Sequence, residues 1–220
     1  LENPSYFNIT PSSVSVTFPD DPSPFIQNFC ITPNGNHPDL EISILPLTPA
    51  RPGFDTKCKL FYKNKGNQLQ SGSFSLTFND NVLDLVSSVP LQNTISGNML
   101  SWNFTDLSPM ESREVMVVFN ANTPTESPAL NANDVISFTA NITSALVDEI
   151  PIDNIFNLNQ TVVNSYDPND KTCLQGKTVS SEVIGEYVHY LIRFENTGSY
   201  NAQNITVTDY IDTSKFDIST

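Results

Sequence analysis

Residues 186–212 read EYVHYLIRFENTGSYNAQNITVTDYID, and two alternating runs with a turn between them stand out in this stretch. Apolar and aromatic residues alternate with polar ones through residues 187–194 and again through 205–210. Alternation with a period of two places one side of a strand in a core and the other side in water. The tripeptide NTG at residues 196–198 interrupts the alternation. The stretch therefore predicts a strand, a tight turn and a second strand.

A weaker copy of this pattern lies about 130 residues earlier in the chain, a spacing typical of a domain. Residues 54–85 read FDTKCKLFYKNKGNQLQSGSFSLTFNDNVLDL, and NKG at residues 64–66 matches NTG. Lysine replaces threonine in this copy, and Asp209 has no clear counterpart in it. Because the pattern recurs at domain spacing, the sequence indicates a modular array.

Residues 38–166 contain enough short alternating runs for one complete domain. Proline, asparagine and glycine separate the runs about every ten residues, and no amphipathic helix of useful length is present. Trp102, Phe104, Phe119 and Phe138 are the expected core aromatics. We predict an immunoglobulin-like sandwich, with strands at Leu40–Leu45, Thr56–Lys63, Ser73–Phe78, Val82–Ser87, Met99–Phe104, Val115–Asn120, Val135–Ile142 and Ile155–Val163.

The flanking segments are too short to form domains by themselves. Residues 1–37 hold two alternating runs, at 14–18 and 25–31, and we expect them to be the C-terminal strands of an upstream β domain. Residues 167–220 are expected to form a joint and the first strands of a following β-sandwich. The predicted fold class is all-β, with tandem immunoglobulin-like antiparallel β-sandwiches. The chain begins at Leu1 without an initiator methionine or a signal region, so we expect a piece of a longer protein.

The charge of the chain restricts its partners. The formal net charge is −14, with only 10 Lys and Arg residues, so nucleic acid and anionic membrane surfaces are poor partners. No apolar run reaches the length of a membrane span. An acidic surface attracts divalent cations, and calcium is the expected one because it prefers carboxylate and carbonyl oxygens. Acidity that simply keeps the protein soluble is the alternative.

Three cysteines, Cys30, Cys58 and Cys173, lie far apart and show no zinc-site spacing. One disulfide would leave a free thiol, and three separate buried thiols fit the sequence equally well.

The motifs around the second copy resemble a known family. Tyr190 to Asp209, with its strand, Asn-Thr-Gly and Asn-Ile-x-Val-x-Asp run, resembles the tandem immunoglobulin-like surface-repeat domains of bacteria. The run YDPNDK at 166–171, followed by CLQG at 173–176, is similar to the joint in large proteins exported by the type IX secretion system. The resemblance implies a non-catalytic module of a multidomain protein that is secreted or held on the outer cell surface.

The same joint supplies the predicted metal site. Asp167, Asn169 and Asp170 offer three oxygen ligands within four residues. Calcium takes six to eight oxygens, so a neighbouring loop would have to complete the shell. The candidates for this completion are Asp148, Glu149 and Asp209. A turn in which these side chains cap their own backbone is the alternative.

Catalytic constellations are weak in this sequence. His37 lies beside a turn and His189 within a predicted strand, and we expect structural or solvent roles for both. No nucleophile elbow or glycine-rich phosphate loop occurs. Acidic pairs that could hydrolyse glycosides lie in turns, where they usually cap the backbone.

The leading hypothesis for function is a non-catalytic stalk or adhesive interaction module. Its expected partners are neighbouring domains of the same chain, the secretion machinery that exports it, and cell-surface or glycan ligands. The alternatives are an accessory β-sandwich of an exported polysaccharide-acting enzyme and a carbohydrate-binding module. Tyr6, Tyr62, Tyr187 and Tyr200 are scattered along the chain and predict no aromatic platform for a sugar.

Overall fold

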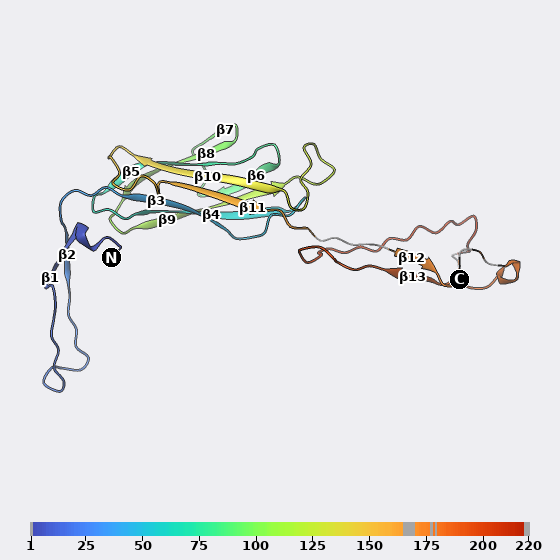
Figure 1. Ribbon diagram of the computed structural model, residues 1–220, viewed down its shortest axis with the longest axis horizontal. Helices are drawn as coiled ribbons and strands as arrows, with labels where there is room; N and C mark the ends of the chain where they lie inside the picture. Colours follow the sequence, from blue (N-terminus) through green and yellow to red (C-terminus); the bar gives the residue numbers. More distant parts are fainter. Residues whose placement is uncertain (1, 165–169, 177, 179, 218–220) are drawn as a thin grey trace. The chain divides into compact units, whose positions relative to one another are not determined.

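The computed structural model describes residues 2–164, 170–176, 178 and 180–217. The chain divides into two compact units, Leu1–Val162 and Val163–Thr220 (Figure 1). The described residues form strands and two short 3-10 helices and contain no α-helix, which confirms the all-β fold class. Within this described part, no helix is long and apolar enough to cross a membrane.

Unit 1 contains a sandwich of two antiparallel sheets (Figure 1). One sheet has the strand order β3-β4-β9-β6 and the other β11-β10-β5-β8-β7. In the immunoglobulin fold one sheet holds strands A-B-E-D and the other holds C, F and G. The first sheet has the A-B-E-D arrangement, and β11-β10-β5 has that of G-F-C, extended by β8 and β7. The strand bounds are β3 Leu40–Pro46, β4 Asp55–Asn64, β5 Gln70–Thr77, β6 Leu83–Val89, β7 Thr94–Ser96, β8 Met99–Leu107, β9 Ser112–Ala121, β10 Val135–Ser144 and β11 Ile155–Thr161.

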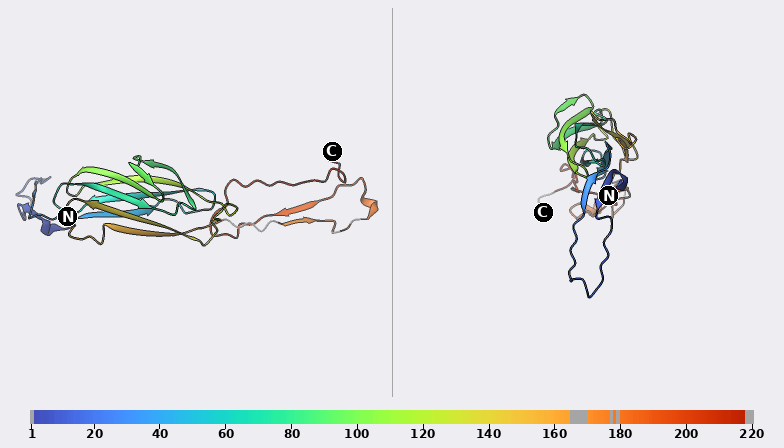
Figure 2. Two further views of the ribbon diagram at one scale, coloured as in Figure 1. Left: turned by 90° about the horizontal axis from the view of Figure 1, so that it is seen from above. Right: turned by 90° about the vertical axis from the view of Figure 1, so that its left-hand side faces the viewer.

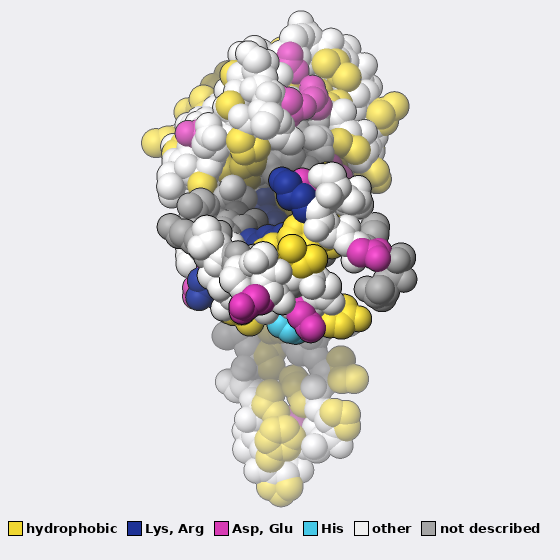
Figure 3. Space-filling model, turned by 90° about the vertical axis from the view of Figure 1, so that its right-hand side faces the viewer, with side chains coloured by type: hydrophobic (Ala, Val, Ile, Leu, Met, Phe, Trp, Pro, Cys, Tyr) yellow, Lys and Arg dark blue, Asp and Glu magenta, His cyan; other side chains and the backbone are white. Residues whose placement is uncertain are grey.

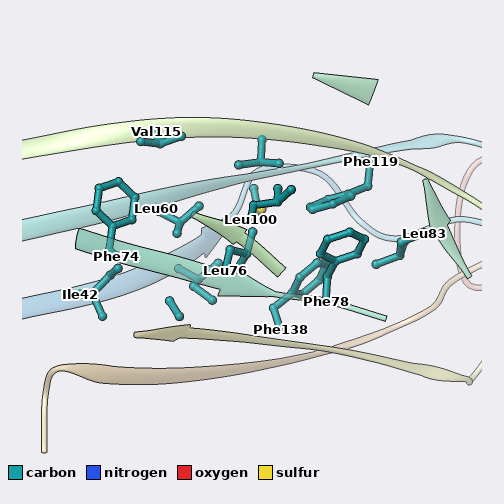
Figure 4. Close-up of a cluster of buried hydrophobic side chains, with 14 of the residues drawn as sticks. Ile42, Leu60, Phe74, Leu76, Phe78, Leu83, Leu100, Val115, Phe119 and Phe138 are labelled. Atoms are coloured by element: carbon teal, nitrogen blue, oxygen red, sulfur yellow. The ribbon is translucent and has the colours of Figure 1, made fainter. Parts of the chain in front are cut away.

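The core lies between the two sheets and consists of the side chains that alternate inward. Strand β4 buries every second residue and leaves the others more exposed, as the period of two requires. Aromatic rings meet across the sandwich, with Tyr62 4.5 Å from Phe74 and Phe119 5.7 Å from Phe138 between ring centroids. Figure 4 shows Phe78 and Phe138 beside Phe119 in this cluster, and the ring centroids of Phe78 and Phe119 are 4.6 Å apart. Such contacts add to the stabilisation from burial alone.

The predicted sandwich is confirmed in most of its parts. All eight predicted strands are present, with ends that differ by at most three residues. The four expected core aromatics, Trp102, Phe104, Phe119 and Phe138, are all buried. Strand β7 is missing from the prediction because its three residues are all exposed and show no alternation.

Strands β3 and β11 run in the same direction, although they belong to different sheets. At one end, the Ile42 N–H of β3 donates to the Asp153 carbonyl just before β11 (3.1 Å). At the other end, Gln160 Nε2 near the end of β11 donates to the Thr48 carbonyl just after β3 (2.8 Å). The chain therefore enters the sandwich at one end and leaves it at the opposite end.

The N-terminal part of unit 1 is a two-stranded ribbon, β1 (Phe7–Thr10) with β2 (Cys30–Pro33), preceded by a 3-10 helix, η1 (Pro4–Tyr6) (Figure 2). The alternating runs predict strands at 14–18 and 25–31, whereas the ladder lies at the base of the ribbon. Two strands alone cannot bury a core. The strands of the ribbon therefore pair only at its base, where further hydrogen bonds hold the chain. The Asn34 N–H, for example, donates to the Tyr6 carbonyl (2.9 Å). The assignment of residues 1–37 to an upstream domain stays a prediction.

The three cysteines are free thiols in the structure. Cys30 is exposed, Cys58 is buried in the core and Cys173 is half-buried. Burial raises the pKa of the Cys58 thiol to about 12. The arrangement matches the alternative of three separate thiols, although only Cys58 is fully buried.

Unit 2 contains β12 (Asp170–Cys173), a 3-10 helix η2 (Ser181–Val183) and β13 (Tyr190–Arg193), with β12 and β13 paired antiparallel. The strand predicted at 187–194 is thus present only over Tyr190–Arg193, and residues 205–210 form no strand. In unit 1 the segment that follows the NKG turn becomes β5 because β8 and β10 pair with it on both sides. No described segment of unit 2 pairs with residues 205–210 in this way.

Truncation of Phe119 tests the cohesion of the sandwich. Phe119→Ala should lower the free energy of unfolding of unit 1 by about 3–5 kcal/mol, because the side chain is fully buried between the sheets. The measurement is urea unfolding followed by tryptophan fluorescence, since the single Trp102 is itself in this core. The matched control is Phe61→Ala on the outer face of β4, which should cost less than half as much. Equal losses from the two variants would contradict this description of the core.

Candidate metal centre

Three aspartates meet at the end of the sandwich where β3 begins. Asp39 immediately precedes β3, and Asp148 and Asp153 belong to the loop between β10 and β11. Each carboxylate offers one oxygen such that the three oxygens lie within 4.8 Å of one another. Asp39 is fully buried and the other two are half-buried. Carboxylate oxygens gathered in this way are ligands for a hard divalent cation.

Backbone hydrogen bonds fix the loop that carries two of these aspartates. Asp148 Oδ2 accepts from the Leu40 N–H (2.8 Å), and its Oδ1 accepts from the Ile150 N–H (2.9 Å). The Asp153 carbonyl accepts from the Ile42 N–H, as described above. The loop is therefore joined to the first residues of β3, and this contact brings Asp148 and Asp153 to Asp39.

The turn after β4 closes the cluster from another side. The N–H groups of Lys65 and Gly66 both donate to the Asp39 carbonyl (2.8 and 3.0 Å). A Cβ atom on Gly66 would lie 2.2 Å from the His37 carbonyl oxygen, so only glycine allows this approach. Lys65 Nζ then reaches Asp153 Oδ2 at 2.7 Å and Glu41 Oε2 at 3.7 Å.

The electrostatic setting of Asp39 is unfavourable for its charge. Burial raises the pKa of Asp39 to about 6, Lys65 opposes the rise, and the charges of Asp153 and Asp148 add to it. Asn3 Nδ2 donates to Asp39 Oδ2 (3.0 Å), which favours the ionised form. Two buried carboxylate oxygens, Asp39 Oδ1 and Asp153 Oδ1, have no hydrogen-bond partner among the described residues. Buried polar atoms are normally satisfied, so both atoms have capacity for a further ligand.

A second polar group lies beside the cluster. His37 Nδ1 is 2.7 Å from Glu149 Oε1, and the His37 ring stacks on Tyr6 with centroids 4.3 Å apart. Asn67 Nδ2 donates to the Tyr6 carbonyl (2.8 Å). These contacts attach the base of the ribbon to the sandwich, which agrees with the structural role expected for His37. In unit 2, His189 is exposed.

The metal ligands predicted at the joint are only partly described. Asp167 and Asn169 lie outside the described residues. Asp170 is described, and its carboxylate forms an ion pair with Arg193. Asp209, one of the residues expected to complete that shell, is paired with Lys171 (2.6 Å). The joint site stays a prediction.

The structure places the other two completing residues in unit 1. Asp148 belongs to the three-aspartate cluster, and Glu149 pairs with His37. Asp39 and Asp153 were not among the ligands predicted from the sequence. Asp39 directly precedes β3, and Asp153 lies two residues before β11. These positions next to predicted strands were a usable signal, but the sequence did not reveal that the two strands begin at the same end of the sandwich.

The two Asn-x-Gly turns have the same local structure. Asn64 Nδ2 donates to the carbonyl four residues further on (2.7 Å), and Asn64 Oδ1 accepts from the Gly66 N–H (3.1 Å). Asn196 makes the same two bonds, at 2.6 Å to the carbonyl four residues on and at 3.0 Å from the Gly198 N–H. The turns at Asn64 and Asn196 are therefore alike in conformation as well as in sequence.

One protein-family model matches part of the chain. The model of DUF7619, a domain of unknown function, matches residues 167–220. No curated protein matches the sequence.

Several solved structures are similar to the chain at low sequence identity. The CARDB domain of a Pyrococcus furiosus protein in complex with di-metal ions is 15% identical, with a TM-score of 0.41, over 58% of this chain and 90% of that one. The cohesin module of a Clostridium perfringens family 33 glycoside hydrolase is 9% identical, with a TM-score of 0.39, over 59% and 99%. A cohesin from Clostridium acetobutylicum, CaCohA2, is 14% identical, with a TM-score of 0.37, over 58% and 92%.

Replacement of Asp39 tests the electrostatics of the cluster. In metal-free buffer at pH 7, Asp39→Asn should raise the melting temperature. The substitution removes a negative charge that is buried and that lies beside the negative charges of Asp148 and Asp153. The pKa of Asp39 is about 6 in the folded protein and has an ordinary value of 3.8, so the folded state binds this proton more tightly than the unfolded state. The destabilisation by ionised Asp39 is therefore absent below about pH 4 and complete above about pH 6.

The measurement is thermal unfolding of both proteins from pH 4 to pH 8 in the presence of a chelator. The variant should exceed the wild type at pH 7, and the advantage should shrink towards pH 4. A variant that melts below the wild type at pH 7 would contradict the conclusion that ionised Asp39 destabilises the folded protein.

Proposed function

We propose that the chain is a non-catalytic module of a large exported bacterial protein, in which β-sandwiches follow one another as a stalk that presents interaction surfaces. Its first partners are the neighbouring domains of the same polypeptide. One observation carries the proposal. Equivalent side chains before the two Asn-x-Gly turns are buried in unit 1 and exposed in unit 2.

In unit 1, the inward side chains before the turn are covered by the opposite sheet. Tyr62, Leu60 and Cys58 lie two, four and six residues before Asn64, and their exposed fractions are 6%, 0% and 4%. This strand is β4, and it pairs on one side with β3. Its inward face is part of the hydrophobic core of the sandwich.

In unit 2, the same positions remain largely in contact with solvent. Phe194, Ile192 and Tyr190 lie two, four and six residues before Asn196, and their exposed fractions are 52%, 38% and 42%. Exposed hydrophobic side chains, drawn in yellow, are visible on the face shown in Figure 3. A strand with a regular apolar face is normally covered, so these side chains are suited to the core of a second sandwich.

A cavity within unit 2 supports the proposal of a second core. It has a volume of about 430 Å³ and lies between the β12–β13 pair and residues 205–209. Its lining includes Ile192, Phe194, Ile205 and Val207. The rest of the lining is polar or charged and includes Lys171 and Asp209. Protein interiors are closely packed, so the apolar part of a space of this size is suited to side chains from further strands.

The course of the chain through unit 1 supports a serial arrangement. Because β3 and β11 run in the same direction, the segments before and after the sandwich leave from opposite ends of unit 1. Modules with this course can be joined end to end without a long connection. The net charge of −14 supports a soluble protein outside the cell, and the resemblance at residues 166–176 supports export by the type IX secretion system.

Hydrogen exchange tests the proposal. In the 220-residue chain, the amides of residues 205–209 should exchange rapidly. The amides of residues 190–194 should be only weakly protected, because the β12–β13 pair has just two strands and such a pair is marginally stable. In a polypeptide extended through the residues that follow Thr220 in the gene product, the same amides should become protected by at least about a hundredfold, because new strands would pair with them and cover them. The amides of β4 are the internal control and should exchange equally slowly in both proteins.

Equal exchange of residues 190–194 and 205–209 in both polypeptides would overturn the second sandwich. A gene that codes for no further strands after this segment would overturn it as well. Surface exposure in the cell is tested separately, by labelling intact bacteria and culture medium with an antibody against the sandwich.

A further inference from the structure

We infer that Asp39, Asp148 and Asp153 form a calcium site that joins the start of β3 to the loop between β10 and β11. The site lies wholly within unit 1 and is distinct from the one predicted at the joint. It is independent of the proposed function. Three observations carry it: unsatisfied oxygens, an excess of negative charge, and the chemistry of the ligands.

The first observation is the pair of unsatisfied oxygens. Asp39 is fully buried, and in the part of the chain that the structure describes its Oδ1 atom has no hydrogen-bond partner. Asp153 Oδ1 is also buried and also without a partner. Leaving one such atom unsatisfied costs more free energy than a typical hydrogen bond contributes. Two such atoms in a single carboxylate cluster indicate that the cluster binds a cation, which carboxylate oxygens can coordinate.

The second observation is the balance of charge around the cluster. Lys65 is the cation that contacts it, with Nζ at 2.7 Å from Asp153 and 3.7 Å from Glu41. The single positive charge of Lys65 is therefore shared by two carboxylates, while Asp39 and Asp148 contribute two further negative charges. His37 on the neighbouring segment is already paired with Glu149. A divalent cation compensates the remaining charge.

The third observation is the type and position of the ligands. All three side chains offer oxygen, without histidine nitrogen or cysteine sulfur, which favours calcium or magnesium over zinc and copper. Calcium accepts irregular sets of six to eight oxygens, whereas magnesium requires near-ideal octahedral geometry. The cluster comes from one residue before a strand and two residues of a loop, and this favours calcium. Water and carbonyl oxygens would complete the shell.

The position of the site suggests what the ion does. Asp39 follows the segment that links the ribbon to the sandwich, and its Oδ2 atom accepts from Asn3. Asp148 and Asp153 hold the loop through which the chain passes from β10 to β11. An ion shared by these residues would fasten the ribbon, β3 and the loop to one another. The end of unit 1 that receives the ribbon would then be rigid only when calcium is present.

Calcium titration of the full 220-residue chain by isothermal calorimetry, after removal of metal with a chelator, tests the site. The wild type should bind about one calcium in unit 1 with a Kd in the range of roughly 10⁻⁴–10⁻³ M that is typical of extracellular modules. Asp39→Asn and Asp153→Asn should each weaken this binding by at least about tenfold. Asp39→Asn should remain folded without metal, so a loss of binding in it cannot be attributed to unfolding.

The matched control is Asp80→Asn. Asp80 is an exposed aspartate in the loop after β5. The start of β5 pairs with Ser144 next to the cluster, so the loop after β5 lies at the opposite end of the strand. This variant should bind calcium as the wild type does. Calcium should also slow the exchange of the Leu40 and Ile42 amides, whose acceptors belong to the loop between β10 and β11.

Three results would overturn the inference. The first is an absence of calcium binding up to about 10 mM, well above the expected range. The second is magnesium binding at least as tight as that of calcium. The third is binding that persists in Asp39→Asn and Asp153→Asn but is lost in Asp170→Asn, which would place the ion at the joint instead.

Discussion

The packing of aromatic rings between the two sheets is the interaction on which the rest of the structure depends. Tyr62 and Phe119 from one sheet meet Phe74 and Phe138 from the other, and the alternation of the strands directs all four inward. Because this contact sets how the sheets lie on each other, it also sets where their strands begin. The start of β3 and the loop before β11 come together for this reason, and Asp39 thereby meets Asp148 and Asp153, which lie more than a hundred residues later in the chain.

Local patterns predicted the sandwich well because its strands are covered on one face only. Alternation located β4 and β10 within two residues, and it correctly placed Trp102 and Phe119 in the core. The same rule failed at residues 205–210, which alternate clearly but form no strand. Alternation reports which side of a segment suits a core, whereas a strand also needs neighbours that accept its backbone hydrogen bonds.

The candidate site could not be predicted to the same extent. Asp167, Asn169 and Asp170 were predicted as ligands because they lie within four residues of one another, and of these only Asp170 is described, in an ion pair with Arg193. Asp39 and Asp153 precede the first and the last strand of the sandwich and are therefore far apart in the sequence. The position of Asp39 also depends on the close approach of Gly66. A ligand set assembled by strand order is visible only after the order is known. The composition of the chain, with its large excess of acidic residues, predicts a divalent cation without indicating which residues would bind it.

The common direction of β3 and β11 has a mechanical consequence. A pull applied to the chain at both ends of unit 1 acts along these two strands. The hydrogen bonds of an antiparallel pair lie perpendicular to its strands. Such a load shears the seven residue pairs between β3 and β4 together, from Leu40–Asn64 to Pro46–Cys58, and cannot open them one after another. The sandwich is therefore oriented to resist stretching along the path of its own polypeptide.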